Sequence, residues 1–389
     1  MKGLMIRAEW APKKEYILSE AEKRRKISYR GNMVWKNPTF AIETDIPDPK
    51  PGPKSVVLKV AACGVCGSDP HMLWKTDDNY VYFPGECGFP VIPGHEFSGE
   101  VIAVGKDVKK IKVGDLVTAE ECQWCGECNP CRAGYFNQCV DLDQLGFDYP
   151  NNGAMAEYVM VEEKFCWPLT DMQRVYTNKD KLLEAGSLIE PTCVAYEGIF
   201  TIAKGIQPGG NVAVFGTGPI GLASIQLLKT SGAGAIFAFE PNEFRRELAK
   251  KMGADFVYDP TDKSVNPAEI VKEFTHGEGV AMSVEAAGIY DQTIPHMEKM
   301  AGVAGKLVLI GMGPALPKID PMTYHRNGLM LCATLGHSGH GDFPSVINLM
   351  ANGRVDMTPA ITSRYSLDKA TEGILASNSG NNAKVLIKP

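Results

Sequence analysis

Short apolar segments alternate with helical patterns between about residues 205 and 340, and this rhythm constrains the fold more than any other feature. Each apolar segment has strand character, and the residues that follow each of the first three segments carry apolar side chains at helical spacing. Strict alternation of strand and helix predicts a parallel, doubly wound α/β sheet. The expected strands are Val212–Phe215, Ala235–Phe239, Phe256–Tyr258, Met282–Val284, Lys306–Ile310 and Leu329–Leu335.

A glycine-rich turn joins the first of these strands to the helix after it. The turn fits the pattern G-x-G-x-x-G and lies directly between strand and helix, which is the context that the pattern requires. Its glycines allow a tight turn, a close approach of pyrophosphate to the backbone, and close packing of helix on strand. Free N–H groups at the helix start attract phosphate. The expected cofactor-binding residues here are Gly216, Gly218, Pro219, Ile220 and Gly221.

An acidic residue ends the next strand. Glu240 lies 19 residues after Gly221, where a carboxylate accepts hydrogen bonds from ribose hydroxyls and repels a 2′-phosphate. This position favours NAD over NADP. Arg245 and Arg246 lie close by and favour NADP instead, since an arginine can bind the 2′-phosphate. Arg245 is expected to contact the cofactor. Strand, glycines, helix and acid together make a turn without a ligand the weaker interpretation.

Five cysteines crowd into residues 122–139. Cys125, Cys128, Cys131 and Cys139 are spaced closely enough to surround one tetrahedral ion, and four thiolates leave no open coordination position. The spacing therefore predicts a structural zinc ion. An iron–sulfur cluster is the alternative, since it also takes four thiolates. Cys122 is a fifth candidate for four positions.

A second set of potential ligands is spread over the first half of the chain. Cys66 follows Cys63 closely, but no second cysteine pair completes a metal knuckle there. His95 and Glu96 come about thirty residues later, and Glu190 lies within an apolar run. One thiolate, one imidazole and one or two carboxylates would leave an open position on zinc, as catalytic sites do. Taken singly, each of these residues is equally well a buried structural residue.

The first third of the chain has short strand-like runs and turns, unlike the alternating strands and helices after residue 205. Short strand-like runs at residues 56–60, 101–105 and 116–118 are separated by glycine and aspartate. This spacing predicts a β-rich, partly barrel-like domain. After about residue 340 an amphipathic helix leads to a last strand, Ala383–Ile387.

The whole chain resembles the zinc-dependent medium-chain dehydrogenases, and among them the branch of polyol (sorbitol) and threonine dehydrogenases. Residues 66–69 are similar to the first zinc-ligand motif of that family and residues 94–99 to the second, and the cysteine lobe and the glycine turn follow in the family's order. The resemblance implies a GroES-like catalytic domain at residues 1–200, with a structural zinc lobe at about 122–140. It further implies a Rossmann NAD-binding domain at residues 201–340 and a return to the catalytic domain at residues 341–389.

The resemblance also implies roles for individual residues. Cys66 and His95 are similar to the catalytic zinc ligands, and either Glu96 or Glu190 would complete the set. An acid followed by proline at position 190 is typical of the polyol branch, where alcohol dehydrogenases proper have cysteine. Asp69 resembles the acid that orients the histidine ligand, and Ser68 and His71 fall where the family has its proton relay.

These roles predict an oxidoreductase with two zinc ions per chain. It would transfer hydride between NAD and a secondary hydroxyl of a polyol, cyclitol or keto-inositol. The alternatives are L-threonine 3-dehydrogenase, another secondary-alcohol or diol dehydrogenase, and, from another class, a non-catalytic NAD-binding sensor. Retention of Cys66, Ser68 and His71 together favours catalysis over sensing.

Charge and hydropathy narrow the expected partners to small molecules. The net charge is −6 and no polybasic arm is present, so nucleic acid is not expected. The start of the chain lacks the apolar core of a signal peptide, and the uncharged residues 211–228 contain the glycine turn. We therefore expect a cytoplasmic enzyme without a membrane segment, and the family resemblance implies a homodimer or homotetramer.

Two segments depart from the family pattern. Residues 11–36 form an insertion rich in lysine and arginine, and residues 74–88 form a long segment that carries Tyr80, Tyr82 and Phe83 and is expected near the substrate. Because both segments differ from the family pattern, the substrate cannot be assigned from the family resemblance alone. His337 and His340 lie in a glycine-rich loop, which is more typical of a turn than of a metal-binding pair.

Overall fold

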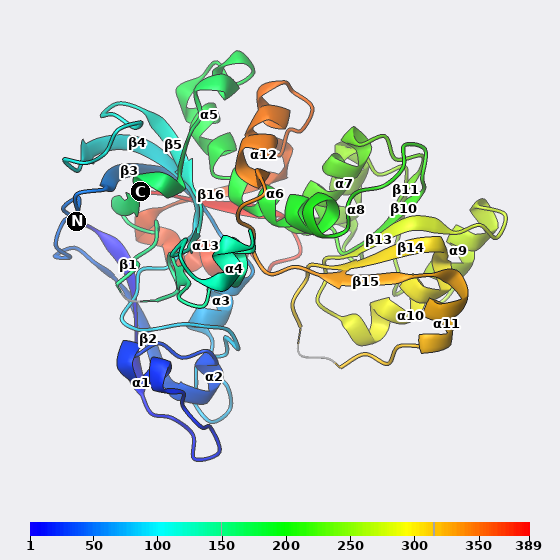
Figure 1. Cartoon of the computed structure of the whole chain (residues 1–389), viewed down its shortest axis with the longest axis horizontal. Coiled ribbons are helices and arrows are strands. Elements are labelled where there is room, and N and C mark those ends of the chain that lie inside the picture. Colours follow the sequence, from blue (N-terminus) through cyan, green and yellow to red (C-terminus); the bar gives the residue numbers. More distant parts are fainter. Residues whose placement is uncertain (149, 314–315) are drawn as a thin grey trace. The chain divides into compact units, whose positions relative to one another are not determined.

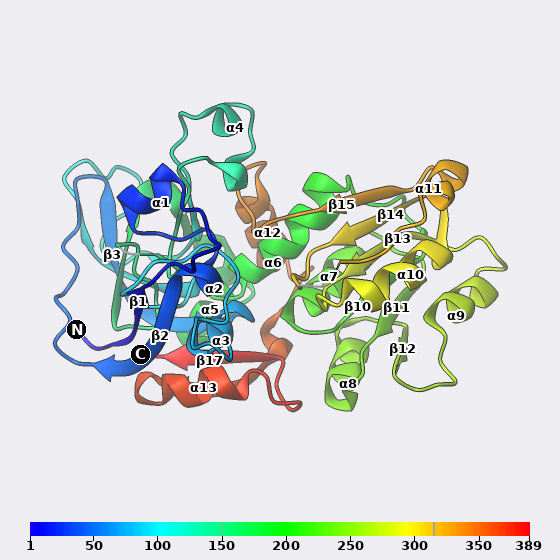
Figure 2. The same ribbon diagram turned by 90° about the horizontal axis from the view of Figure 1, so that it is seen from below.

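The computed structural model describes residues 1–148, 150–313 and 316–389 and divides into two compact units. The first unit comprises Met1–Glu190, Ser363–Ser379 and Val385–Pro389. The second comprises Pro191–Thr362 and Gly380–Lys384. Figures 1 and 2 show the elements of each unit in two views.

The first unit is built on an antiparallel sheet in the order β16-β17-β3-β4-β5-β9, with β8 paired to β3. Its strands are β3 (Ser55–Gly64), β4 (Glu96–Val104), β5 (Leu116–Ala119), β8 (Tyr158–Glu162), β9 (Cys166–Pro168), β16 (Ile361–Ser366) and β17 (Lys384–Lys388). The late strand β17 pairs with the end of β3, where Leu386 lies opposite Gly64 and Ile387 opposite Cys63. This sheet confirms the predicted β-rich domain.

A second, two-stranded sheet joins β1 (Gly3–Trp10) and β2 (Trp35–Glu43) as an antiparallel pair. Two short helices lie between these strands, α1 (Glu20–Arg25) and α2 (Gly31–Val34). Ser19 caps α1 in a reciprocal capping box with Glu22. The remaining short elements of the unit are α3 (Ser68–Leu73), β6 (Cys122–Gln123), α4 (Asn129–Arg132), β7 (Asp143–Gln144), α5 (Lys179–Gly186) and α13 (Ala370–Ala376).

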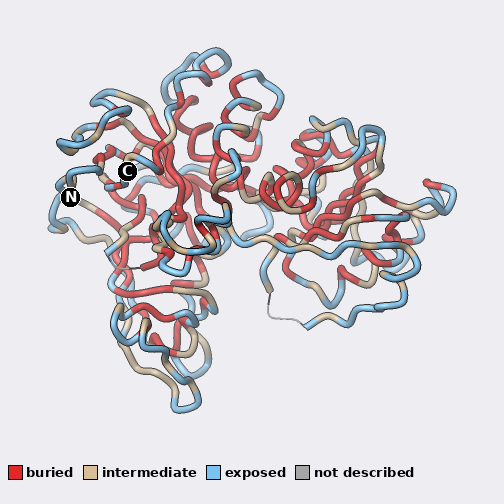
Figure 3. The backbone as a smooth tube through the Cα atoms, in the orientation of Figure 1, coloured by how far each residue is buried: buried red, intermediate tan, exposed pale blue. Residues whose placement is uncertain are grey.

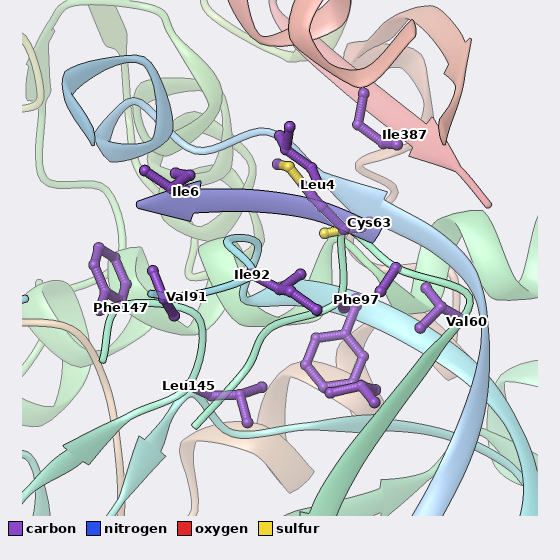
Figure 4. Packing of buried hydrophobic residues seen from close by; sticks show 14 of the residues in the cluster. Leu4, Ile6, Val60, Cys63, Val91, Ile92, Phe97, Leu145, Phe147 and Ile387 are labelled. Atoms are coloured by element: carbon purple, nitrogen blue, oxygen red, sulfur yellow. The ribbon is translucent and has the colours of Figure 1, made fainter. Parts of the chain in front are cut away.

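The core of the first unit draws on segments that are far apart in the sequence. Buried residues of β1, β3 and β4 pack with Leu145 and Phe147, which follow the cysteine lobe, and with Ile387 of β17 (Figure 4). Figure 3 shows how buried, intermediate and exposed residues are distributed along the backbone. The side chains that follow β3 and precede β4 are therefore held by a rigid layer.

The second unit contains a six-stranded parallel sheet in the order β12-β11-β10-β13-β14-β15. This order confirms the predicted doubly wound fold. Its strands are β10 (Val212–Phe215), β11 (Ile236–Phe239), β12 (Phe256–Tyr258), β13 (Val280–Glu285), β14 (Ala301–Leu309) and β15 (Met330–Ala333). The helices of the unit are α6 (Ile189–Tyr196, continued by a π-helical turn over Glu197–Ile202), α7 (Pro219–Thr230), α8 (Glu243–Met252), α9 (Pro267–Phe274), α10 (Tyr290–Met300), α11 (Pro321–Asn327) and α12 (Asp342–Ala351).

The division between the units differs from the one expected from the sequence. The second unit begins at Pro191, before residue 201, and it retains residues 341–362, which were expected to return to the catalytic domain. Packing explains the second difference. Asp342 accepts a hydrogen bond from Thr201 Oγ1 at 2.8 Å, and the ring of Phe343 contacts His337 edge-on at 4.8 Å, all within the second unit.

In the described part of the chain, no helix is long and apolar enough to cross a lipid bilayer.

Candidate catalytic metal site and nucleotide pocket

The catalytic cluster lies where β3 ends and β4 begins. Gly64, the last residue of β3, is the register partner of Glu96, the first residue of β4. This pairing brings the loop that carries Cys66 next to His95. The ligand atoms of Cys66, His95 and Glu96 lie within 4.8 Å of one another. A β-carbon at Gly64 would lie 2.2 Å from Glu96 Oε2, so the glycine is what leaves room for this carboxylate.

The electrostatics around His95 fit a cation. Burial alone would lower the pKa of this fully buried imidazole, but the Cys66 thiolate, Glu121 and Asp69 outweigh that effect and raise the pKa well above 6.5. The Nδ1 atom of His95 has no hydrogen-bond partner among the described residues. Anionic groups around a buried imidazole with an open nitrogen are the donor set of a zinc site.

Asp69 positions the first ligand loop. Its Oδ2 accepts a hydrogen bond from the backbone N–H of Cys66 at 2.8 Å, and its side chain is buried. The carboxylate thus fixes the loop through the backbone of Cys66 and contributes charge to His95. This arrangement agrees with an orienting role for Asp69.

Glu190 is buried near the start of α6, and the structure pairs it with a second acid. Carboxylate oxygens of Glu190 and Glu121 lie within 4.8 Å of each other, whereas the group around Cys66 contains Glu96. Sequence reasoning missed Glu121, which lies two residues after the end of β5, next to the cysteine lobe. All three carboxylates are buried; Glu96 groups with Cys66 and His95, whereas Glu121, which groups with Glu190, acts electrostatically on His95.

The two expected relay residues share helix α3. Ser68 Oγ is buried and has no hydrogen-bond partner within the described ranges of the chain. The His71 ring packs against Trp74 at 5.5 Å and Tyr82 at 5.2 Å between ring centroids. Burial lowers the pKa of His71 below 6.5, so the imidazole is neutral and able to accept a proton near pH 7.

The cysteine lobe holds four sulfur atoms together. Those of Cys125, Cys128, Cys131 and Cys139 lie within 4.8 Å of one another, and the backbone N–H groups of Glu127 and Cys128 each donate to Cys125 Sγ at 3.4 Å. Backbone donors lower the pKa of Cys128 to about 6, whereas burial raises that of Cys139 to about 12. Four converging sulfurs fit a tetrahedral metal ion. Cys122 packs against this group without joining it.

The second unit contains a pocket of about 400 Å³ at the carboxyl ends of β10 and β11. Helix α7 begins at Pro219, and its free N–H groups follow the turn. Gly216 has a positive φ of 82°, and a β-carbon at Gly221 would lie 1.9 Å from the carbonyl oxygen of Gly216. A β-carbon at Gly218 would meet no protein atom within 4 Å. This open space beside Gly218 fits a pyrophosphate.

Glu240 and Arg245 both line this pocket. Glu240 is buried, and its carboxylate accepts hydrogen bonds from the backbone N–H of Thr217 at 2.8 Å and of Asn242 at 3.0 Å. Arg245 Nε donates to Asn382 O at 2.9 Å. His296 also lines the pocket and lies on α10, and no pattern in the sequence marks it as a site residue.

The two remaining histidines of interest lie in the second unit. His337 is buried and packs on Phe343, and His340 adopts a positive φ of 49° in the glycine-rich loop. The backbone there has the geometry of a turn, as expected.

The fold, the two metal-binding groups and the nucleotide pocket define a zinc-dependent alcohol dehydrogenase with a Rossmann-type cofactor domain. The chain belongs to the zinc-binding dehydrogenase family. Residues 52–171 match the alcohol dehydrogenase GroES-like domain, and residues 219–352 match the zinc-binding dehydrogenase domain.

Similar proteins agree with this assignment. The chain is 39% identical to the scyllo-inosose 3-dehydrogenase of Thermotoga maritima over 96% of both chains. It is 34% identical to an L-threonine 3-dehydrogenase of Caldanaerobacter subterraneus, with 88% of this chain and 93% of the other covered. A solved structure from Thermotoga maritima, assigned as an alcohol dehydrogenase, superposes with a TM-score of 0.94 at 38% identity over 100% of both chains. The chain is thus an oxidoreductase that uses zinc and a nicotinamide dinucleotide.

Proposed function

We propose that this protein oxidises a secondary hydroxyl of a cyclitol or keto-inositol to the ketone, reversibly, with NAD as the hydride acceptor. The observation that carries the proposal is the buried carboxylate of Glu96 beside Cys66 and His95, together with a second pair of buried carboxylates, Glu121 and Glu190, of which Glu121 acts electrostatically on His95. Carboxylates are strong acceptors for hydroxyl groups, and a substrate with several neighbouring hydroxyls offers them matching donors.

The residues that hold the catalytic ion are Cys66 and His95 together with Glu96 or Glu190. When bound, zinc supplies Lewis acidity that lowers the pKa of a substrate hydroxyl, and the nicotinamide takes up hydride. Asp69 holds the Cys66 loop through its backbone. Ser68 Oγ accepts the substrate proton as it gives up its own hydroxyl proton, and the neutral imidazole of His71 takes up the released proton and passes it to solvent.

The cysteine lobe would hold a second zinc ion through Cys125, Cys128, Cys131 and Cys139. Such an ion would be structural, because four cysteine sulfurs would leave no coordination position for a substrate.

The choice of NAD over NADP rests on Glu240. A buried carboxylate in the nucleotide pocket repels a 2′-phosphate, and about 1.4 kcal/mol of such repulsion corresponds to a tenfold loss of affinity. Arg245 lies in the same pocket and would attract that phosphate. Catalytic efficiency with each cofactor measures which residue prevails: we expect at least a tenfold preference for NAD, and Glu240→Gln should reduce it. Equal efficiency with NADP would show that Arg245 dominates.

The substrate assignment is favoured over L-threonine for a chemical reason. An amino acid needs a donor group for its carboxylate, and no such group is assigned among the described residues of the site, whereas a cyclitol presents neighbouring hydroxyls that buried carboxylates accept. The 39% identity to a scyllo-inosose 3-dehydrogenase supports the same choice.

A cofactor-reduction screen tests the proposal. Purified protein with zinc and NAD would be assayed on inositols and inososes, sugar alcohols, 2,3-butanediol, L-threonine and cyclohexanol, the last as a ring without neighbouring hydroxyls. We expect the highest kcat/KM with a cyclitol or inosose and a loss of orders of magnitude with cyclohexanol. Preferential oxidation of threonine or of simple alcohols would contradict the substrate assignment.

We further propose a homodimer or homotetramer, which light scattering of the purified protein tests.

A further inference from the structure

The two segments that depart from the family pattern lie against each other. We call residues 11–36, together with the adjoining Asn37, the clamp segment and residues 74–88 the aromatic segment. Backbone hydrogen bonds join them along their length, from the mutual pair Ser28–Cys87 at 2.8 and 2.9 Å to the bond from Asn37 N to Asn79 O at 2.8 Å. Between these lie the bonds Gly31 N to Gly85 O, Asn32 N to Phe83 O and Val81 N to Trp35 O.

Side chains reinforce the contact. Lys13 Nζ forms an ion pair with Asp78 at 2.6 Å and lies 4.4 Å from the centroid of the Tyr80 ring. Tyr80 in turn donates its hydroxyl to Ala11 O at 2.8 Å. A β-carbon at Gly31 would lie 2.5 Å from Cys87 Sγ, so the two backbones approach as closely as a glycine allows. The clamp segment therefore fixes the position of the aromatic segment.

The aromatic segment presents two partly exposed rings beside the proton relay. Trp74 is 36% and Tyr82 46% exposed, and both rings contact His71. The bond from Tyr82 N to Trp74 O, at 2.9 Å, holds the two residues at the base of one loop. His71 itself lies on the helix that follows the Cys66 loop.

The next residue ties the same segment to the metal ligands. Phe83 stacks on Phe147 at 5.5 Å, and Phe147 stacks on His95 at 4.7 Å between ring centroids. One segment thus contacts the relay through Tyr82 and reaches a metal ligand through Phe83. Its placement is coupled to both parts of the site.

We propose that Trp74 and Tyr82 form an aromatic wall that receives the C–H face of a ring-shaped polyol, and that the clamp segment is the positioning device for this wall. The proposal rests on the proposed function and extends it from hydroxyl recognition to ring recognition. A cyclitol in its chair form presents C–H bonds on its faces and hydroxyls at its rim. The negative face of an aromatic ring attracts such C–H groups, while the buried carboxylates accept hydrogen bonds from the rim. An open-chain polyol has no such face.

Kinetics of paired substrates test the wall. For Trp74→Ala and Tyr82→Ala we expect KM for a cyclitol to rise roughly tenfold, while KM for 2,3-butanediol changes less than twofold. Tyr82→Phe should restore the wild-type KM for the cyclitol, because the ring rather than the hydroxyl carries the contact. Phe40→Ala, an aromatic of similar exposure on β2, is the matched control. Equal losses on both substrates would overturn the proposal.

The clamp is tested through residues that touch no substrate. Lys13→Ala and Asp78→Asn remove the same ion pair, so each should raise KM for the cyclitol several-fold with kcat unchanged, and the double variant should lose no more than either one. A fall in kcat for both substrates would indicate general loss of structure and would contradict a positioning role.

A binding measurement separates failure of the wall from failure of the proposed function. Quenching of tryptophan fluorescence by a cyclitol, lost in Trp74→Phe, reports the contact whether or not turnover occurs. Quenching without NAD reduction would support the aromatic wall and contradict the proposed reaction. NAD reduction with quenching unchanged in Trp74→Phe would support the proposed reaction and contradict the aromatic wall.

Discussion

The phenyl ring of Phe147 lies nearly flat on the imidazole of His95, with centroids 4.7 Å apart and planes inclined by 27°. Phe147 follows the cysteine lobe in sequence and belongs to the core of the first unit (Figure 4). The stacking fixes the plane of the His95 imidazole, a proposed zinc ligand, and Phe147 has no polar side-chain atom of its own. We expect Phe147→Leu, which keeps most of the volume, to weaken zinc binding at the catalytic site.

Release of zinc to a chelating dye measures this effect. The catalytic ion should leave several-fold faster from Phe147→Leu than from the wild type, since an orienting neighbour of a ligand tunes metal affinity. Phe89→Leu is the control, because Phe89 is buried in the same core and packs on Trp35. Identical release from both variants would contradict the role assigned to Phe147.

The two metal groups predict different consequences for two cysteine substitutions. Elemental analysis should give two zinc ions per chain. Cys66→Ala should abolish activity and leave thermal stability near that of the wild type, because the core around β3 does not depend on that thiol. Cys128→Ala should lower the melting temperature, since four sulfurs hold the lobe together. Equal unfolding in both variants would contradict the division between catalytic and structural ions.

Two glycines of the nucleotide turn predict opposite outcomes. In Gly221→Ala the new β-carbon would lie 1.9 Å from Gly216 O, so we expect a lower melting temperature. In Gly218→Ala the β-carbon meets no protein atom within 4 Å, and the backbone φ of −65° suits alanine. The second variant should fold normally and bind NADH more weakly, because the methyl group occupies the space for pyrophosphate. Calorimetry and NADH fluorescence distinguish the two effects.

Glu184 links helix α5 to two late strands and makes stability depend on pH. Arg364 donates to both carboxylate oxygens at 2.8 and 2.7 Å, and Lys388 donates at 2.9 Å. The Arg364 hydrogen bond is the main cause that lowers the pKa of Glu184 to about 2. A lowered pKa contributes stability above the unfolded value of 4.5, and this contribution is lost as pH falls towards about 2.

Glu184→Gln should therefore destabilise the first unit at neutral pH. We expect about 1 kcal/mol, or about 2–4 °C in melting temperature, because Arg364 is half exposed and solvent screens the pair. The difference from the wild type should stay constant from pH 8 to pH 6 and shrink below pH 4.5. Glu100→Gln, which loses only an exposed pair with Lys179, should change nothing.

The pKa of His71 predicts the acidic limb of the rate profile. Burial keeps this pKa below 6.5, so the neutral, proton-accepting imidazole persists to lower pH. The limb of kcat/KM for alcohol oxidation should lie below pH 6.5 in the wild type and move upward in Tyr82→Ala, where water reaches the ring. His71→Gln should remove the limb and lower kcat roughly a hundredfold. An unchanged limb in His71→Gln would exclude His71 from the relay.

The nucleotide fold could be predicted because its signals are local. A buried parallel strand is a short apolar run, and the glycine turn follows one such run directly. The cap of α9 is equally local: Asn266 accepts from Glu269 N as its residue type suggests. Helix α10 escaped prediction because Pro295 interrupts its pattern.

The candidate site could be predicted only in part. Cys66, His95 and Glu96 were recognisable from residue type and family resemblance, and the register of β3 with β4 explains their proximity. Glu121 and Phe147 could not be recognised from the sequence, because only the tertiary packing around the cysteine lobe brings them to the site. The contact between the clamp and aromatic segments was equally hidden, since it depends on backbone bonds between residues far apart in sequence.

The pairing of β17 with β3 has a consequence for biosynthesis. Val65 donates its N–H to Val385 O at 2.9 Å, one residue before Cys66, and Cys63 lies opposite Ile387. A nascent chain exposes the Cys66 loop long before Val385 leaves the ribosome, and until then this part of β3 lacks its hydrogen-bonded neighbour. The catalytic ligands thus reach their final arrangement only late in translation, whereas the four cysteines of the lobe, close together in sequence, are free to assemble early. Loading of the two metals would therefore be ordered in time, with the structural ion first.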